Sequence, residues 1–219
     1  MNTPIVQLLV LAGIAIFLIL RLRSVLGTRD GFEKPKAPAP ANRSDRRPDF
    51  EVIEGGPDLD ITDHVSEGSP AAEALAQMKR ADPAFNVGEF LGGARGAYEM
   101  ILMGFENGDI EDLRDFLSPE VYESFEEVIE QRRQQGLTIE ASFAGVREMT
   151  LVDATFDEAS RRGEVTVKYV GELTQVVKNA AGEVIEGSAT SVTKQKDVWT
   201  YGRIMGSDDP NWQLVATDE

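Results

Sequence analysis

The sequence contains no cysteine and one histidine, His64. Without cysteine, disulfides, thiolate catalysis and cysteine-ligated metals are excluded. The absence of cysteine also excludes Cys-His arrangements, and the usual zinc sites lack the cysteine or second histidine that they need. A Ser-His-Asp arrangement would have to use His64. His64 lies in a polar stretch with Asp60, Asp63 and Ser66, so we interpret it as a solvated residue. The sequence therefore predicts no catalytic residue, no metal and no cofactor.

Basic residues are also scarce. Lys and Arg number 22 against 38 Asp and Glu, which gives a formal net charge of -16. Nucleic acid is therefore not an expected partner, because phosphate binding needs a basic surface. Hydrophobic residues make up 42% of the 219 residues, enough for one folded domain of ordinary size with additional segments.

One long apolar run lies at the N-terminus. Residues 5–20 read IVQLLVLAGIAIFLIL, and Gln7 is the one polar residue among them. As a helix this run rises about 24 Å, and its flanking residues extend it toward the ~30 Å hydrocarbon layer of a membrane. No basic residue precedes the run, which argues against a cleaved signal peptide. We therefore expect residues 1–22 to be a transmembrane anchor.

The basic residues that follow this run indicate its orientation. They are Arg21, Arg23, Arg29, Lys34 and Lys36. Positive charges concentrate on the cytoplasmic side of membrane spans. The sequence therefore predicts a single-pass protein whose C-terminal domain faces the cytoplasm.

Residues 23–69 read as a disordered, Pro-rich and acidic linker. Residues 34–41, KPKAPAPA, favour an extended spacer. Residues 21–47 contain eight basic and three acidic residues, whereas residues 48–69 contain seven acidic and no basic ones. The basic half could lie on anionic lipid, or the charges could be unpatterned in a flexible tether. Both interpretations stay open.

One apolar patch interrupts the linker. Phe50, Val52 and Ile53 lie in the acidic context DFEVIEGG. Such a patch could dock on a partner or on the domain's own sheet edge. It could equally be an incidental cluster.

From residue 70 onward the pattern is helical. Ser69-Pro70 and Ser118-Pro119 each combine an N-cap residue with proline at the first helical position. The apolar spacing predicts helices over residues 71–80, 87–105, 110–117 and 120–135. We expect Asp109 to cap the third of these helices.

Three glycines lie inside the predicted helix over residues 87–105. They are Gly92, Gly93 and Gly96. Each glycine costs about 1 kcal/mol inside a helix. We therefore expect another backbone or a ligand to approach closely here.

After Gly136 the apolar period changes from 3.6 to 2 residues. The pattern predicts strands over residues 137–152, 163–170, 171–177, 188–201 and 212–216, with a hairpin turn at 179–183. Helices followed by strands predict an α+β domain with helices packed on one face of an antiparallel sheet. Arg203 and Asp197 could pair near the sheet edge.

Several spaced motifs carry a family resemblance. They are FLGGARGAYEMI from Phe90, LRDFLSPEVYESFEEVI from Leu113, DVWTYGR from Asp197 and DPNWQLVAT from Asp209. In this order they resemble the Tim forty-four-like domain family, the membrane adaptor of the mitochondrial import inner-membrane translocase. Its alphaproteobacterial TimA-type membrane-anchored members are the most similar. The resemblance covers residues 70–219.

The resemblance implies a cone-shaped domain of the nuclear-transport-factor-two type, with helices packed on a curved antiparallel sheet around an apolar pocket. It also implies a membrane-tethered adaptor or scaffold of the bacterial inner membrane, in protein translocation or membrane-complex assembly. The expected partners are another membrane protein and the lipid bilayer. A homo-oligomer stays open. The long charged N-terminal part of the mitochondrial members is missing here, which puts chaperone recruitment in doubt.

The same fold class includes isomerases, which use a buried carboxylate or a Tyr–Asp pair. Tyr98 and Glu99 point about 100° apart on a helix. Nothing in the sequence places a second carboxylate beside a tyrosine. We therefore expect no enzymatic activity.

The adaptor interpretation predicts an apolar binding surface for a partner or lipid. Its candidate residues are Leu75, Met78, Phe85, Phe90, Leu91, Tyr98 and Trp212. These side chains could instead simply cover the sheet. A further alternative is a ligand-binding module whose pocket holds a lipid acyl chain.

Overall fold

The computed structural model describes residues 56–218. Within this range, no helix is both long and apolar enough to cross a membrane. The predicted anchor, residues 1–22, and most of the predicted linker lie outside the described residues.

Helices precede strands along the described chain, which confirms the α+β class. The helices are α2 (Leu59–Thr62), α3 (Pro70–Ala81), α4 (Val87–Asn107), the 3-10 helix η1 (Glu111–Phe116) and α5 (Pro119–Gln134). The strands are β1 (Thr138–Asp157), β2 (Arg162–Lys178), β3 (Val184–Ile204) and β4 (Gln213–Asp218).

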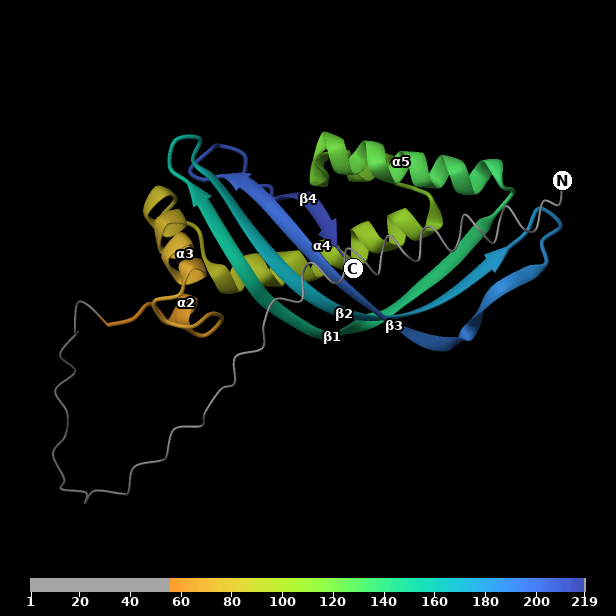
Figure 1. Cartoon of the computed structure of the whole chain (residues 1–219), viewed down its shortest axis with the longest axis horizontal. Helices are drawn as coiled ribbons and strands as arrows, with labels where there is room; N and C mark the ends of the chain where they lie inside the picture. Colours follow the sequence, from red (N-terminus) through yellow and green to blue (C-terminus); the bar gives the residue numbers. More distant parts are fainter. Residues whose placement is uncertain (1–55, 219) are drawn as a thin grey trace, which may run out of the picture. The chain divides into compact units, whose positions relative to one another are not determined.

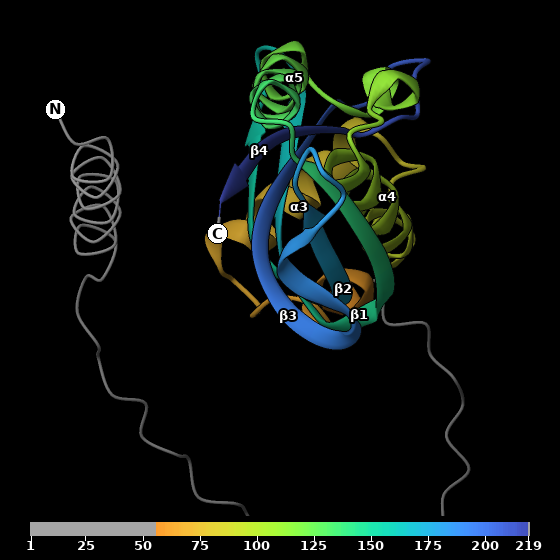
Figure 2. The same cartoon turned by 90° about the vertical axis from the view of Figure 1, so that its right-hand side faces the viewer.

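The four strands form one antiparallel sheet in the order β1-β2-β3-β4. Figure 1 shows that the sheet is strongly curved, and Figure 2 shows β1 and β3 bending around the space that α3 and α4 occupy. An irregularity in the pairing of β2 with β3 accounts for part of this bending. In β3, Thr193 pairs with Leu173 and Ser188 pairs with Gln175, so residues 189–192 bulge opposite Thr174 alone. Such bulges bend strands and end regular pairing.

The predicted helix starts are confirmed. The hydroxyl of Ser69 accepts a hydrogen bond from the amide of Ala72 (3.2 Å), and that of Ser118 accepts one from Val121 (3.3 Å). Each cap satisfies an amide that has no partner within the helix.

The predicted role of Asp109 as a helix cap is wrong. Residue 110 occupies that position, without a side-chain hydrogen bond, and the element is a 3-10 helix. The amide of Asp109 instead donates to the carbonyl of Gly104 (2.8 Å). Gly108, in the left-handed conformation, ends α4 at this point. Asp109 therefore helps to close α4.

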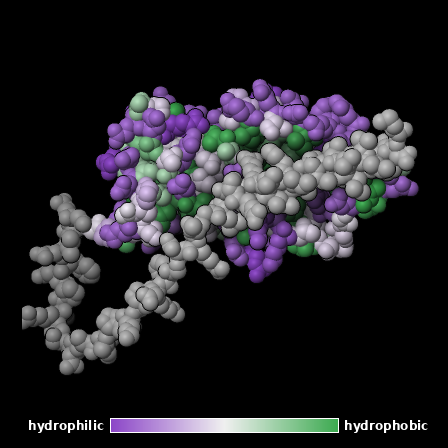
Figure 3. Space-filling view, viewed as in Figure 1, coloured by the Kyte–Doolittle hydropathy of each residue, from purple (hydrophilic) through white to green (hydrophobic). Residues whose placement is uncertain are grey.

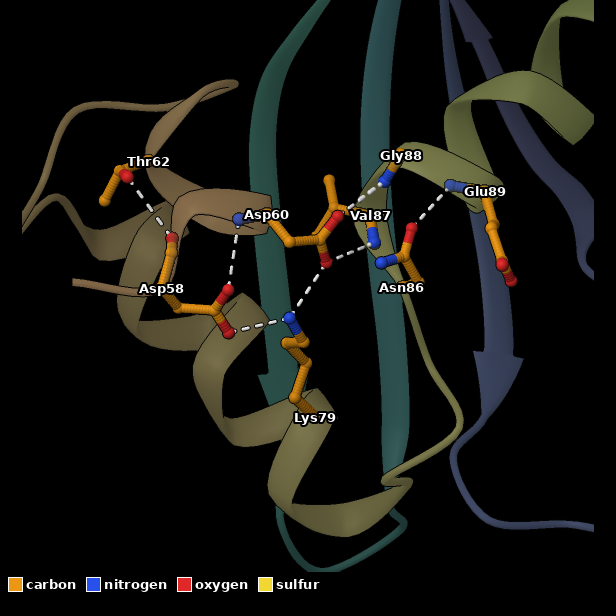
Figure 4. A network of polar contacts seen from close by, with 8 residues as sticks. All are labelled: Asp58, Asp60, Thr62, Lys79, Asn86, Val87, Gly88 and Glu89. Atoms are coloured by element: carbon orange, nitrogen blue, oxygen red, sulfur yellow. Dashed lines mark hydrogen bonds and ion pairs between the residues drawn. The ribbon is translucent and has the colours of Figure 1, made fainter. Parts of the chain in front are cut away.

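The folded unit begins before residue 70, within the stretch that the sequence assigned to the linker. Figure 4 shows how α2 is attached to α3 and α4. The Asp60 carboxylate accepts hydrogen bonds from the amides of Val87 (2.8 Å) and Gly88 (3.0 Å) at the start of α4. Lys79 of α3 forms ion pairs with Asp58 (2.7 Å) and Asp60 (2.9 Å). We call this set of contacts the α2 clamp.

A single cluster of buried apolar side chains joins the helices to the sheet. It includes Ile61 of α2, the inward face of α4, Val165 and Val167 of β2, and Trp199 of β3. At the far end of α4, the rings of Phe105 and Phe125 attach α5, with centroids 4.4 Å apart. On the part of the face in Figure 3 that is not covered by grey atoms, hydrophilic residues predominate, and hydrophobic residues show below α5 and in smaller patches elsewhere.

Another segment of the chain does approach α4 closely, but it does so at Gly104 and not at the three glycines that the sequence indicated. A Cβ atom added at Gly92, Gly93 or Gly96 would meet nothing within 4 Å in the described part of the chain. A Cβ atom at Gly104 would lie 2.5 Å from Leu113 and 2.7 Å from the carbonyl of Asp109. The turn into η1 therefore needs glycine at position 104.

Candidate functional site

A cleft of about 300 Å³ lies where the start of α4 meets the connection between β3 and β4. Large aromatic side chains dominate its walls. We call it the aromatic cleft, and its lining consists of Ala84, Phe85, Asn86, Glu89, Phe90, Gly93, Ala94, Ala97, Phe116, Tyr201, Arg203, Pro210, Asn211 and Trp212.

Four aromatic side chains of the lining, from three separate segments of the chain, contact one another. The ring of Phe90 in α4 lies 4.6 Å from Trp212 and 5.9 Å from Tyr201, measured between centroids. Phe85, from the loop before α4, lies 5.6 Å from Trp212. Tilted and edge-on aromatic pairs of this kind stabilise the arrangement of their rings by about 0.5–1.5 kcal/mol each. The walls of the cleft are therefore preformed.

Small residues of α4 form another part of the lining. Ala94 is buried, whereas Gly93 is exposed and has open space where a side chain would stand. The third small residue is Ala97. A bulky apolar group can therefore approach the α4 backbone closely here.

Arg203 of β3 provides the positive charge of the cleft. Its guanidinium donates to the carboxylate of Asp82 and to the carbonyl of Pro210 (3.2 Å), and it lies over the Trp212 ring at 5.3 Å. Its Nε is buried and has no hydrogen-bond partner among the described residues. A buried donor without an acceptor is unfavourable by about 1–3 kcal/mol.

The predicted pair of Arg203 and Asp197 is wrong. Asp197 and Arg203 lie six positions apart on the same strand, β3. Their side chains lie on the same face, but the rise of about 3.3 Å per residue along a strand separates them by about 20 Å. Arg203 therefore reaches Asp82 at the end of α3, and Asp197 is buried in the middle of the sheet.

Asp197 is the polar residue that sequence analysis missed. Its carboxylate accepts a hydrogen bond of 2.5 Å from the hydroxyl of Tyr98 and one of 3.0 Å from Gln195. The expectation that no carboxylate lies beside a tyrosine is therefore wrong. The pairing joins residues 99 positions apart in the sequence, and no local pattern indicates it.

Two more tyrosines connect this pair to the cleft. The rings of Tyr98 and Tyr169 stack with centroids 4.2 Å apart, and the Tyr169 and Tyr201 hydroxyls lie 3.0 Å apart. Burial raises the pKa of all three hydroxyls, and the Asp197 carboxylate raises that of Tyr98 further. The three phenols therefore stay protonated and act as hydrogen-bond donors.

The family model for the Tim44-like domain matches residues 71–219. The chain belongs to the Tim44-like domain family.

The similarity to curated relatives is modest. The matched region is 26% identical over 148 residues to the mitochondrial import inner membrane translocase subunit TIM44 of Homo sapiens and to that of Rattus norvegicus. It covers 66% of this chain but 32% of each relative, so the chain spans about a third of their length. Among solved structures, the intermembrane space region of the chloroplast protein ARC6 is 14% identical, with a TM-score of 0.40, covering 56% of this chain and 88% of that one.

In this Tim44-like domain, three of the seven candidate residues meet at the cleft. Phe85, Phe90 and Trp212 line it. Phe85 and Phe90 are also buried residues of the core, 5% and 8% exposed, so they present only part of their rings to the cleft. The other four candidates are buried in the core and do not line the cleft: Leu75, Met78, Leu91 and Tyr98. Leu75, Met78 and Tyr98 are completely buried, so they support the domain from behind and are not accessible to a docked group.

A second cavity, of about 460 Å³, lies between η1 and α5 and has a different character. Its rim is acidic, and Arg133 is its single basic residue. The acidic residues are Glu111, Glu123, Glu126, Glu127 and Glu130. These glutamates are not arranged to hold a metal ion, and neither is any other group of three or more His, Asp or Glu side chains in residues 56–218. We therefore regard the aromatic cleft as the candidate site, since binding sites are predominantly apolar with a few placed polar groups.

Proposed function

We propose that this Tim44-like domain is an adaptor that holds a short apolar peptide segment of another membrane-associated protein in its aromatic cleft. The observation that carries the proposal is the preformed contact of Phe85, Phe90 and Trp212 around a cavity of about 300 Å³. Large aromatic anchors are the residues that contribute most to binding at protein interfaces. The similarity to TIM44 translocase subunits supports a role related to protein transport.

The cellular setting belongs to the same proposal. We propose that residues 1–22 anchor the chain in a bacterial inner membrane, with the domain on the cytoplasmic side. The apolar run at residues 5–20 and the basic residues behind it support this arrangement. The curved sheet and its helices would then form the cone that the resemblance implies, held near the membrane by the tether.

We also propose binding in place of catalysis. An isomerase of this fold class would need its acid or base within reach of a substrate. Tyr98 and Asp197 form the buried pair with suitable chemistry, yet neither lines the aromatic cleft or the acidic cavity. The pair is therefore best explained as a structural contact between α4 and β3.

A lipid acyl chain is the competing occupant, because the aromatic walls suit any apolar group. Purification of the full-length protein from its own membranes in mild detergent distinguishes the two. Mass spectrometry would identify both the proteins and the lipids that accompany it. We expect a membrane-protein partner in stoichiometric amount.

The decisive variant is Trp212→Ser, which removes one wall of the cleft. Its matched control is Phe125→Ser, since both aromatic rings are half-buried and Phe125 lies on α5 outside the cleft. We expect the partner to be lost with Trp212→Ser and retained with Phe125→Ser. Recovery of a defined lipid without any partner, or equal loss with both variants, would contradict the proposal.

A further inference from the structure

One edge of the sheet is left uncovered over part of its length. β3 runs from Val184 to Ile204, whereas the much shorter β4 pairs with it over residues 198–202 alone (Figure 1). Residues 193–197 pair regularly with β2 on their other side, and the bulge at residues 189–192 ends this regular stretch. In the described part of the chain, no strand lies on the outer side of residues 193–197. We call these five residues the free edge of β3.

The free edge presents backbone groups that are ready to pair. In an antiparallel sheet, alternate residues direct their N–H and C=O groups toward one neighbouring strand, and the residues between them toward the other. Some backbone groups of the free edge therefore point away from β2. An extended segment of another protein can pair with such an edge as an additional strand. It would continue the line of β4, whose last residue, Asp218, lies opposite Val198.

Lysines mark the outward face of the free edge. Asp197 is buried, so Lys194 and Lys196 face outward, because side chains alternate along a strand. Both lysines are exposed. Lys168 of β2 lies opposite Val198 on the same face, as a diagonal neighbour of Lys196 at about 7–8 Å. The three lysines therefore form one basic patch.

The lysines of this patch have no acidic partner in residues 56–218. The other lysines of this range, Lys79 and Lys178, each form ion pairs with neighbouring carboxylates, whereas Lys168, Lys194 and Lys196 form none. The protein as a whole has a net charge of -16. Unpaired positive charges beside an open strand edge favour a partner of negative charge, since interfaces match opposite potentials.

A second copy of the chain does not fit the free edge. Antiparallel pairing about Gln195 would place Lys194 opposite Lys196 of the second copy, and like charges directly opposite destabilise a sheet. Lysines on edge strands prevent such association. The opposite sign already occurs in β4, where Asp218 lies opposite Val198 and therefore on the same outward face as Lys196.

We propose that the free edge of β3 binds an extended acidic segment of a partner protein as an added strand, at a site separate from the aromatic cleft. The segment carries Asp or Glu at two positions separated by one residue, so that its carboxylates lie beside Lys194 and Lys196. Backbone hydrogen bonds supply affinity, and the lysines select the sequence. An anionic lipid surface would pair with the lysines but not with the strand edge, so a peptide is the occupant that matches both.

Peptide binding to the full-length protein in mild detergent tests the proposal. The probe is a fluorescent, end-capped peptide with two glutamates separated by one valine and flanked by threonines. Its anisotropy is measured at about 0.15 M salt, which screens longer-range attraction. We expect Lys196→Gln to weaken binding about threefold, the contribution of one cross-strand charge pair. Lys168→Gln is the matched control and should change binding less, because Lys168 is also exposed but lies one strand away from the edge.

Backbone methylation separates strand addition from simple charge attraction. Two further peptides carry N-methyl groups on alternate residues, one on the odd positions and the other on the even positions. One of them should lose binding at least about tenfold while the other retains it, because only every second N–H group faces β3.

Three results would overturn the proposal: no binding of the unmodified peptide, equal binding of the two methylated peptides, or equal losses with Lys196→Gln and Lys168→Gln. Acetylation of the lysines in nanodiscs tests the competing occupant. Protection of Lys194 and Lys196 by anionic lipid without peptide would assign this face to the membrane and overturn the proposal as well. Reactive lysines in the same nanodiscs, protected on addition of the acidic peptide, are the result we expect.

Discussion

Tyr98 of α4 donates a hydrogen bond of 2.5 Å to the carboxylate of Asp197 in β3. The Tyr98 side chain is completely buried and Asp197 is 4% exposed, so the bond is shielded from water. Gln195 satisfies the other carboxylate oxygen at 3.0 Å. Hydrogen bonds to a charged group are stronger than those between neutral groups. A buried charged group that loses its hydrogen-bond partner destabilises the folded state. The pair therefore fixes α4 on the sheet behind the aromatic cleft.

Tyr98→Phe should destabilise the domain by about 1–3 kcal/mol, because Asp197 would lose its strongest donor while staying buried. Chemical denaturation of the full-length protein, followed by circular dichroism, measures the change. Asp197→Asn should have a smaller effect, since an amide oxygen still accepts the hydrogen bond. The double variant should lose less than the sum of the two single losses, because the residues contact each other. Strict additivity would show that the bond contributes nothing.

Gly171→Ala should destabilise the domain through a steric clash. A Cβ atom at Gly171 in β2 would lie 2.6 Å from the Tyr98 hydroxyl. Overpacking of this kind typically costs about 1–3 kcal/mol. Thermal unfolding measures the loss, and adding Tyr98→Phe to Gly171→Ala should recover part of it by removing the oxygen. An alanine variant as stable as the natural sequence would contradict this packing.

The same glycine shows what could and could not be predicted from the sequence. The alternating pattern predicted two strands, residues 163–170 and 171–177, with a kink or turn where they meet at Gly171. The structure has one continuous strand, β2, because the missing side chain makes room for Tyr98 rather than for a turn. A sequence pattern gives the period of an element but not which side chain from another element lies against it.

Polar contacts between residues far apart in the sequence were the features that could not be predicted. Arg203 pairs with Asp82 across 121 positions, and Tyr98 with Asp197 across 99. Local periodicity carries no information about such pairs, since they depend on strand register and helix placement together. The aromatic walls were easier to predict, because Phe90 belongs to the apolar stripe of a regular helix and Trp212 precedes a short strand.

Glu106 of α4 should make stability fall as pH rises. Burial raises its pKa above the ordinary value of 4.5, against the opposing effects of Arg132 and of a hydrogen bond from Gln175. The folded state then binds the proton more tightly than the unfolded state, so this contribution is present below pH 4.5 and lost as pH rises through the higher folded pKa. Glu106→Gln should therefore be more stable than the natural protein at pH 7.

Measuring the effect of Glu106→Gln at several pH values tests whether the ionisation of Glu106 causes the difference in stability. The stabilisation by Glu106→Gln should disappear at pH values below the ordinary pKa of a glutamate. Glu99→Gln is the matched control, because Glu99 is an exposed residue of the same helix. Denaturation midpoints measured from pH 4 to pH 8 provide the data. A constant difference between Glu106→Gln and the natural protein over this range would mean that ionisation of Glu106 is not responsible.

Asp60 should show the opposite dependence through the α2 clamp. Burial opposes its ionisation, but hydrogen bonds from Lys79, Val87 and Gly88 outweigh this effect and hold the pKa below the ordinary value of 3.8. The stabilisation by ionised Asp60 is therefore present above pH 3.8 and lost as pH falls through the lower folded pKa. At pH 7, Asp60→Asn should cost about 0.5–2 kcal/mol, the usual contribution of a helix cap.

Asp60→Asn should loosen α2 itself as well as lower the stability of the whole domain. Ile61 is the single residue that α2 buries in the core, so α2 depends strongly on the clamp. Hydrogen exchange of the amides at the start of α4 reports this directly, since the amides of Val87 and Gly88 lose their acceptor. Asp63→Asn is the control, because Asp63 is exposed and its side chain takes no part in the clamp. If both variants exchanged equally fast at these amides, α2 would be held by its apolar contact alone. Faster exchange confined to Asp60→Asn would show that the carboxylate fixes the start of the folded unit on α4, directly beside the aromatic cleft.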